Sequence, residues 1–100
     1  MSSTDVAIDE KIKVVISEPK RWKVILLNDD STPMEFVISV LTEIFKHTRE
    51  QAADIMIQVH ETGSGIAVIY SFEIAEAKAV EATNLARTNS HPLQIKLEEE

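Results

Sequence analysis

A polar stretch, Asn28–Thr32, separates an apolar run from a strong helix start, and this order of segments constrains the fold most. The preceding run, Trp22–Leu27, is rich in strand-forming residues and predicts a strand that is covered on at least one face. Thr32 followed by Pro33, with Glu35 three residues after the threonine, has the pattern of a helix N-cap with a capping box. The polar stretch is therefore expected to join a strand to a helix.

Two more helices are predicted further along the chain. Thr48 repeats the capping pattern and opens a second helix that Gly63 ends, and a third helix is expected over residues 72–88 with Ser71 as its N-cap. Apolar or small residues at helical spacing mark the faces that we expect to be buried. They are Val37, Val40, Leu41, Ile44 and Phe45 in the first helix, Ala52, Ile55, Met56 and Val59 in the second, and Ala75, Ala79, Ala82 and Ala86 in the third.

Two further strands complete the predicted sheet. Residues 65–70 are mostly apolar and β-branched, and residues 93–97 alternate between apolar and polar side chains, as in a strand with one buried face. The order β-α-α-β-α-β in 100 residues predicts one α+β domain, with a three-stranded, mostly antiparallel sheet packed against three helices. We expect this domain over residues 20–100 and a flexible N-terminal arm over residues 1–19, with an edge strand at Lys13–Ser17 as the alternative.

The charge balance excludes one class of partner and favours another. The chain has 10 basic and 17 acidic residues, a net charge of −7, whereas a general nucleic-acid binder needs clustered cations. Partners with cationic groups are favoured instead. The chain has no cysteine, and no apolar run approaches the roughly 20 residues of a membrane helix. With no targeting signal at the N-terminus, we expect a cytoplasmic protein, and a monomer by default.

Asn28, Asp29 and Asp30 have two interpretations. They are ordinary turn residues, and acids ahead of a helix favour its positive end. Alternatively, their amide and carboxylate oxygens accept hydrogen bonds from an ammonium group. His60, four residues after Met56, is either a partly buried structural histidine or a functional residue at an apolar edge.

Met34, Met56 and Val59 also have two interpretations, as plain core residues or as the lining of an adaptable apolar pocket. An enzyme is not expected. The chain has no cysteine nucleophile and no Ser in a nucleophile-elbow context, and Gly63–Gly65 is too short to cradle a phosphate. A transition-metal site built from two carboxylates and His60 is the remaining option, but we expect no cofactor.

Four segments together closely resemble the ClpS family of N-degron adaptors. They are Lys23–Val37, Met56–His60, Glu73–Lys78 and His91–Leu93. The resemblance spans about residues 20–98 and is carried mainly by the long stretch around Asn28–Val37. It implies an adaptor that binds substrates whose first residue is Leu, Phe, Tyr or Trp. Such an adaptor delivers them to a AAA+ unfoldase, ClpA or ClpC, which is paired with the ClpP peptidase.

The resemblance also implies roles for residues, in three groups. These are Asn28, Asp29, Thr32 and His60 for amine binding, Met34, Val37, Met56, Val59 and Leu93 for the hydrophobic side-chain pocket, and Glu73 and Lys78 for unfoldase docking. Met34 matches the position that screens against β-branched residues, and the N-terminal arm matches the extension that engages the unfoldase. Ser31 stands where the family usually has tyrosine, which bears on the ranking of substrates.

The leading hypothesis is thus a non-enzymatic adaptor for N-terminal hydrophobic residues. The alternative is an acidic protein-interaction domain that regulates the unfoldase without using the pocket. A metal-dependent enzyme is the third hypothesis.

Overall fold

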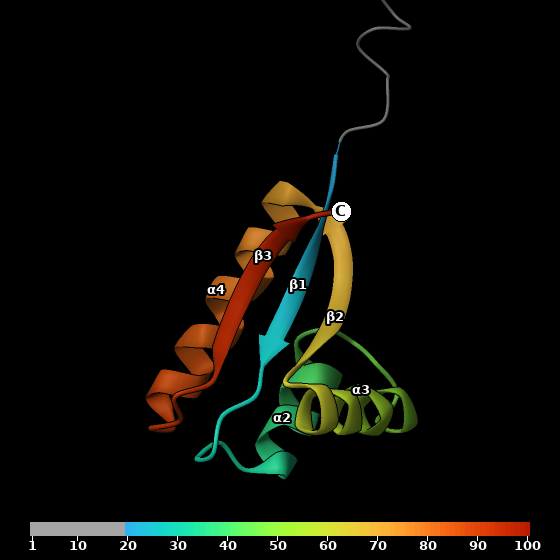
Figure 1. Ribbon diagram of the computed structural model, residues 1–100. Coiled ribbons are helices and arrows are strands. Elements are labelled where there is room, and N and C mark those ends of the chain that lie inside the picture. Colours follow the sequence, from blue (N-terminus) through green and yellow to red (C-terminus); the bar gives the residue numbers. More distant parts are fainter. Residues whose placement is uncertain (1–19) are drawn as a thin grey trace, which may run out of the picture.

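The computed structural model describes residues 20–100. The arm expected over residues 1–19, including the edge strand considered at Lys13–Ser17, lies outside the described residues. Within them, the helices and strands follow the predicted order β-α-α-β-α-β (Figure 1). The elements are β1 (Arg21–Leu27), α2 (Met34–Glu43), α3 (Arg49–Thr62), β2 (Ser64–Ser71), α4 (Phe72–Thr88) and β3 (Gln94–Glu99).

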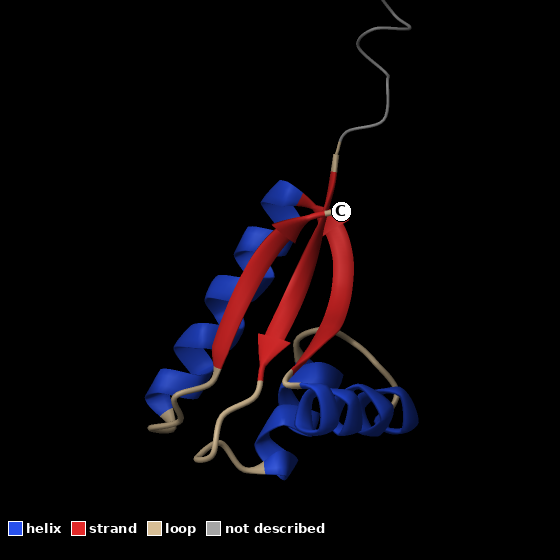
Figure 2. Cartoon of the chain, in the orientation of Figure 1, coloured by secondary structure: helices blue, strands red, loops and turns tan. Residues whose placement is uncertain are grey.

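The strand β1 lies in the middle of a three-stranded sheet with the order β2-β1-β3. Both neighbours run antiparallel to it, which confirms the predicted α+β fold (Figure 2). Val24 of β1 lies opposite Val68 of β2 and Leu97 of β3. Val24 and Leu26 are fully buried, because alternate residues of a strand point to the same face of the sheet.

The helix α4 runs along the sheet and covers one of its faces (Figure 1). Its buried residues are the four predicted alanines, Ala75, Ala79, Ala82 and Ala86. Their small side chains let the helix backbone lie close to the strands. Near the start of α4, the rings of Phe72 and Trp22 meet edge to face, with centroids 5.0 Å apart. None of the helices in residues 20–100 has the length and apolar character to cross a membrane.

The helices α2 and α3 pack together beyond the end of the sheet where β1 ends and β2 begins (Figure 1). Their predicted apolar faces join Leu26 and Leu93 in a single hydrophobic core, with Ile55 only partly buried. Ile44 and Phe45, expected within the first helix, are buried just beyond it, since α2 ends at Glu43. The capping box at Thr48 is present, and Gly63 ends α3 with a φ of 93°, a left-handed conformation that glycine adopts without strain.

The junction between α3 and β2 holds the end of α3 against the end of β1, which is distant in sequence. The backbone N–H of Asn28 donates to the carbonyl of Gly63 over 2.9 Å, which ties the end of β1 to the end of α3. Two residues later, a Cβ atom at Gly65 would lie only 2.8 Å from Cγ2 of Val59. Glycine is thus needed here because β2 passes so close to the last turns of α3.

The predicted capping box at Thr32 is wrong. Pro33 occupies the N-cap position of α2 and its carbonyl accepts from the N–H groups of Phe36 and Val37, without any side-chain cap. The hydroxyl of Thr32 lies in the loop before the helix and donates to the ionised carboxylate of Asp29, a charge-assisted hydrogen bond. Ser71 holds the N-cap position of α4 as predicted, but its side chain makes no capping hydrogen bond.

Candidate functional site

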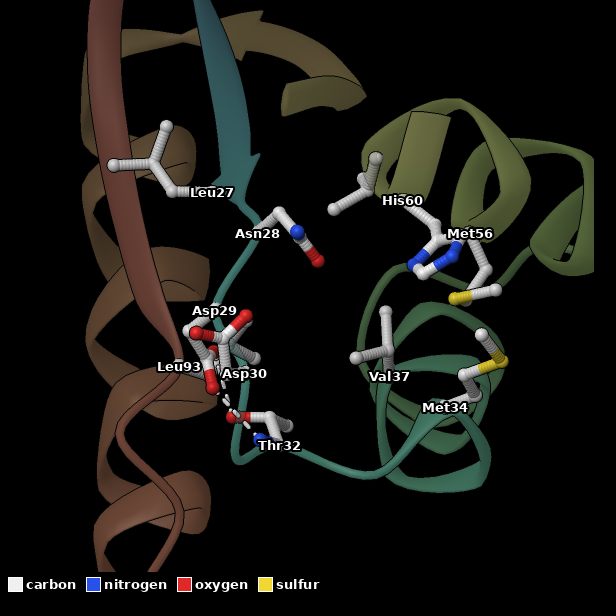
Figure 3. A pocket seen from close by; sticks show the side chains of 11 residues that line it. Leu27, Asn28, Asp29, Asp30, Thr32, Met34, Val37, Met56, His60 and Leu93 are labelled. Carbon is white, nitrogen blue, oxygen red and sulfur yellow. Dashed lines mark hydrogen bonds between the residues drawn. The ribbon is translucent and has the colours of Figure 1, made fainter. Parts of the chain in front are cut away.

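A pocket of about 220 Å³ opens between the loop after β1, the helices α2 and α3, and the segment that precedes β3. Every residue that the resemblance assigned to amine binding or to the side-chain pocket lines it (Figure 3). The lining residues are Leu27, Asn28, Asp29, Asp30, Thr32, Met34, Val37, Met56, Val59, His60 and Leu93. The pocket thus combines side chains from three regions that are far apart in sequence: residues 27–37, residues 56–60 and Leu93.

The polar wall is organised by the carboxylate of Asp29. Its Oδ1 accepts the backbone N–H of Ser31 at 2.8 Å and that of Thr32 at 2.7 Å. Its Oδ2 accepts the hydroxyl of Thr32 at 2.8 Å. An ionised carboxylate can accept about four hydrogen bonds. The loop therefore uses most of the capacity of Asp29 and leaves room for one further donor.

These hydrogen bonds change the acidity of Asp29. Partial burial pushes the pKa of its carboxyl upward, because burial disfavours the charged form. The hydrogen bonds from Thr32 and Ser31 favour the charged form, and the nearby His91 adds a favourable charge interaction. Together, the hydrogen bonds and the charge interaction outweigh burial, so the pKa of Asp29 lies below its ordinary value of 3.8. The pocket holds a carboxylate, not a carboxylic acid, at neutral pH.

Asn28 and His60 face the cavity from opposite sides. Figure 3 shows the side-chain amide of Asn28 directed into the cavity from the end of β1 and the His60 ring across from it on α3. His60 is exposed, so its interpretation as a partly buried structural histidine is wrong. It lies in the last turn of α3, beyond the buried stripe that ends at Val59. Within residues 20–100, its ring forms no hydrogen bond, so its nitrogens are available to a ligand.

The apolar wall consists of well-packed side chains with one exception. Val37, Met56, Val59 and Leu93 are between 1% and 7% exposed, so each belongs to the core as well as to the pocket. Met34, the first residue of α2, is 49% exposed. Figure 3 shows Met34 and Met56 on the same side of the pocket, opposite Asp29 and Asp30. Met56 and Val59 therefore belong to the core and also line the pocket, whereas the core interpretation of Met34 is wrong and Met34 only lines the pocket.

Asp30, which the sequence grouped with Asn28 and Asp29 as an acceptor for an ammonium group, lines the pocket as they do. Two contributors were not identified from the sequence. Leu27 lines the pocket because it precedes Asn28, and that adjacency was the available signal. His91 packs its ring against Phe36 with centroids 4.5 Å apart and lies close enough to Asp29 to favour its charge. No sequence spacing connects His91 with Asp29, so only the folded chain shows this neighbour.

Glu73 and Lys78 do not line the pocket. Both are on α4, which begins at the end of the sheet opposite α2 and α3 (Figure 1). Glu73 is exposed in the first turn, and Nζ of Lys78 lies 3.8 Å from Oε1 of Glu81. In the part of the chain that the structure describes, no cluster of three or more His, Asp or Glu side chains could hold a metal ion.

Comparison with known proteins identifies relatives of this chain. A family model described as "ATP-dependent Clp protease adaptor protein ClpS" matches residues 17–96. Proteins of Gluconobacter oxydans and Bdellovibrio bacteriovorus, both named ATP-dependent Clp protease adapter protein ClpS, are 48% and 51% identical to this chain. The alignments cover 83% and 85% of this chain and 70% and 75% of those proteins. The chain belongs to the ClpS family of Clp protease adaptors.

A solved structure extends the comparison to a ligand complex. The structure of Agrobacterium tumefaciens ClpS2 bound to L-phenylalaninamide matches this fold with a TM-score of 0.80 at 42% sequence identity. The match covers 83% of this chain and all of that chain. A similar chain therefore binds a small derivative of an apolar amino acid.

The lowered pKa of Asp29 gives a direct test of the loop. Its hydrogen bonds exist only in the folded chain, so the folded pKa lies below the unfolded one. The stability that these hydrogen bonds give the folded chain is complete above the pKa of Asp29 in the unfolded chain. It is lost as the pH falls through the pKa of Asp29 in the folded chain. The amide resonances of Ser31 and Thr32 should titrate in NMR spectra with a midpoint below 3.8.

Asp29→Asn is the control, since its amide oxygen can still accept the two backbone N–H groups but does not ionise. The acid titration step should vanish from both resonances. A midpoint at or above 3.8 in the unsubstituted protein would contradict the assignment of these hydrogen bonds.

Proposed function

We propose that this protein binds substrates whose first residue is Leu, Phe, Tyr or Trp and delivers them to a Clp AAA+ unfoldase for degradation. The observation that carries the proposal is the two-sided pocket, with acceptors on one wall and apolar side chains on the other. A chain terminus of this kind presents the matching pair of groups, an ammonium and a bulky apolar side chain on the same α-carbon. Neither group alone identifies an N-terminal residue.

The polar wall suits an α-ammonium group. An α-amino group has a pKa near 7.7–8.0, so it is mostly charged at neutral pH and offers three donors. The unused capacity of the Asp29 carboxylate, the Asn28 amide oxygen and the His60 ring supply acceptors. Hydrogen bonds to charged groups contribute about 1.5–3 kcal/mol each. Thr32 contributes indirectly, because its hydroxyl holds the Asp29 carboxylate in place.

The apolar wall suits the first side chain. Burying a Leu or Phe side chain contributes roughly 1.5–3 kcal/mol. The pocket volume of about 220 Å³ leaves room for one such side chain. L-Phenylalaninamide, which the related ClpS2 protein binds, has both a free α-amino group and an aromatic side chain. The same chemistry therefore supports this ligand class for the present chain.

Delivery requires a second surface, because the pocket is occupied by substrate. Glu73 and Lys78 on α4 are the proposed contacts with the unfoldase, of the ClpA or ClpC type, which works with the ClpP peptidase. Their helix starts at the far end of the sheet, so substrate and unfoldase can be bound together. In this function the adaptor is a monomer that catalyses no reaction itself.

Peptide binding tests the pocket directly. Fluorescence anisotropy should show that a peptide starting with Phe binds at least about tenfold more tightly than its N-acetylated form, since acetylation removes the charge and two of the donors. A peptide starting with Ala should also bind weakly, because it leaves the apolar wall unfilled. Equal affinity for free and acetylated Phe peptides would refute recognition of the terminus.

Delivery can be tested separately from binding. Glu73→Ala should slow degradation of a Phe-initiated reporter by the unfoldase and ClpP several-fold, with unchanged peptide affinity. Glu50→Ala is the matched control, since Glu50 is an exposed acid in the first turn of α3. If the reporter is degraded as fast with Glu73→Ala or Lys78→Ala as with the control variant, these residues are not the docking surface.

A further inference from the structure

The described part of the chain has two methionines, and both line the ligand pocket. Met34 begins α2, and Met56 lies in the middle of α3. Figure 3 shows the thioether groups of both residues on one side of the cavity. Methionine is flexible and polarizable, which suits a wall that must contact several apolar side chains. The sulfur atoms of these methionines also make this wall of the pocket susceptible to oxidation.

The two methionines differ in exposure. Met34 is 49% exposed, whereas Met56 is 7% exposed and packed in the core. Oxidation of methionine by a peroxide requires contact between the oxidant and the sulfur, so its rate increases with exposure. The chain also contains no cysteine that would consume the oxidant first. Met34 is therefore the preferred target on the pocket wall.

Oxidation would change the chemistry of this wall without changing its position. A peroxide transfers one oxygen atom to the Met34 thioether, which becomes a sulfoxide while the peroxide is reduced to water or an alcohol. The sulfoxide is polar and chiral, and an apolar ligand side chain would have to displace water from it without offering a hydrogen bond in return. Because Met34 is half-exposed at the start of its helix, the core can stay packed after the change.

We infer that Met34 is a reversible oxidation site whose oxidation weakens ligand binding under peroxide stress. This inference rests on the proposed function, since it assumes that an apolar first side chain contacts Met34. It adds a regulatory input to the pocket. Methionine sulfoxide reductases would restore the thioether and with it the apolar wall.

The experiment compares peptide affinity before and after mild hydrogen peroxide treatment of the full chain. Peptide mass spectrometry should find an added oxygen at Met34 well before one at Met56. Affinity for a Phe-initiated peptide should fall about tenfold, which corresponds to a polar group left without a partner in an apolar contact. Treatment with the two methionine sulfoxide reductases should restore the original affinity.

Two variants identify the residue responsible. The affinity of untreated Met34→Leu is the reference for that variant, and peroxide treatment should leave its affinity unchanged. Met56→Leu should lose affinity on treatment by the same factor as the unsubstituted chain. The inference is overturned if Met56 reacts first, if Met34→Leu loses as much affinity as the unsubstituted chain, or if protein oxidised at Met34 binds as before.

Failure of the proposed function has a different signature. An untreated protein that does not bind the Phe-initiated peptide would refute the proposed function and this inference together. A protein that binds the peptide and keeps its affinity after oxidation at Met34 would refute only the inference.

Discussion

The carboxylate of Asp29 is the group on which the architecture of the site depends. It accepts two backbone N–H groups and one hydroxyl within the next three residues, so it shapes the loop between β1 and α2. The same carboxylate borders the pocket and is charged at neutral pH, since the hydrogen bonds outweigh the opposing effect of burial on its pKa. One side chain therefore both builds the loop and places a negative charge at the pocket. Of the two interpretations of Asp29, as a turn residue and as a ligand-binding residue, its geometry suits both.

The sheet brings the two walls of the pocket together. The loop after β1 supplies the acceptors, while α2 and α3 supply most of the apolar side chains. The hydrogen bond from Asn28 to the carbonyl of Gly63 and the close approach of Gly65 to Val59 hold these parts in register. Because Val37, Val59 and Leu93 are also core residues, the shape of the apolar wall is as stable as the fold itself.

Local periodicity predicted most of the fold. The alanine stripe of α4, the capping box at Thr48 and the alternation leading into β3 are each determined by neighbours a few residues apart, which a sequence shows directly. The capping box at Thr32 was predicted wrongly for a physical reason. The helix α2 starts later than expected, with Pro33 at its N-cap, while Asp29 holds the N–H and the hydroxyl of Thr32 in the preceding loop.

The pocket was less predictable from residue patterns than the fold. Spacing alone left Met34 and Met56 as either core or pocket residues, and the resemblance to ClpS proteins decided which residues to group. The exposure of His60 and the nearness of His91 to Asp29 depend on how α3 and the loop before β3 meet the first loop. Such contacts join residues more than thirty positions apart, and no local pattern encodes them.

A double-mutant cycle tests most directly whether Asp29 binds the ligand's ammonium group. Affinities of the unsubstituted chain and of Asp29→Asn would be measured for free and N-acetylated Phe peptides, with Asp54→Asn as an equally charged change at an exposed site outside the pocket. The account predicts that Asp29→Asn weakens binding of the free peptide by at least about 1 kcal/mol more than binding of the acetylated one. An equal effect on both peptides would show that Asp29 only shapes the loop.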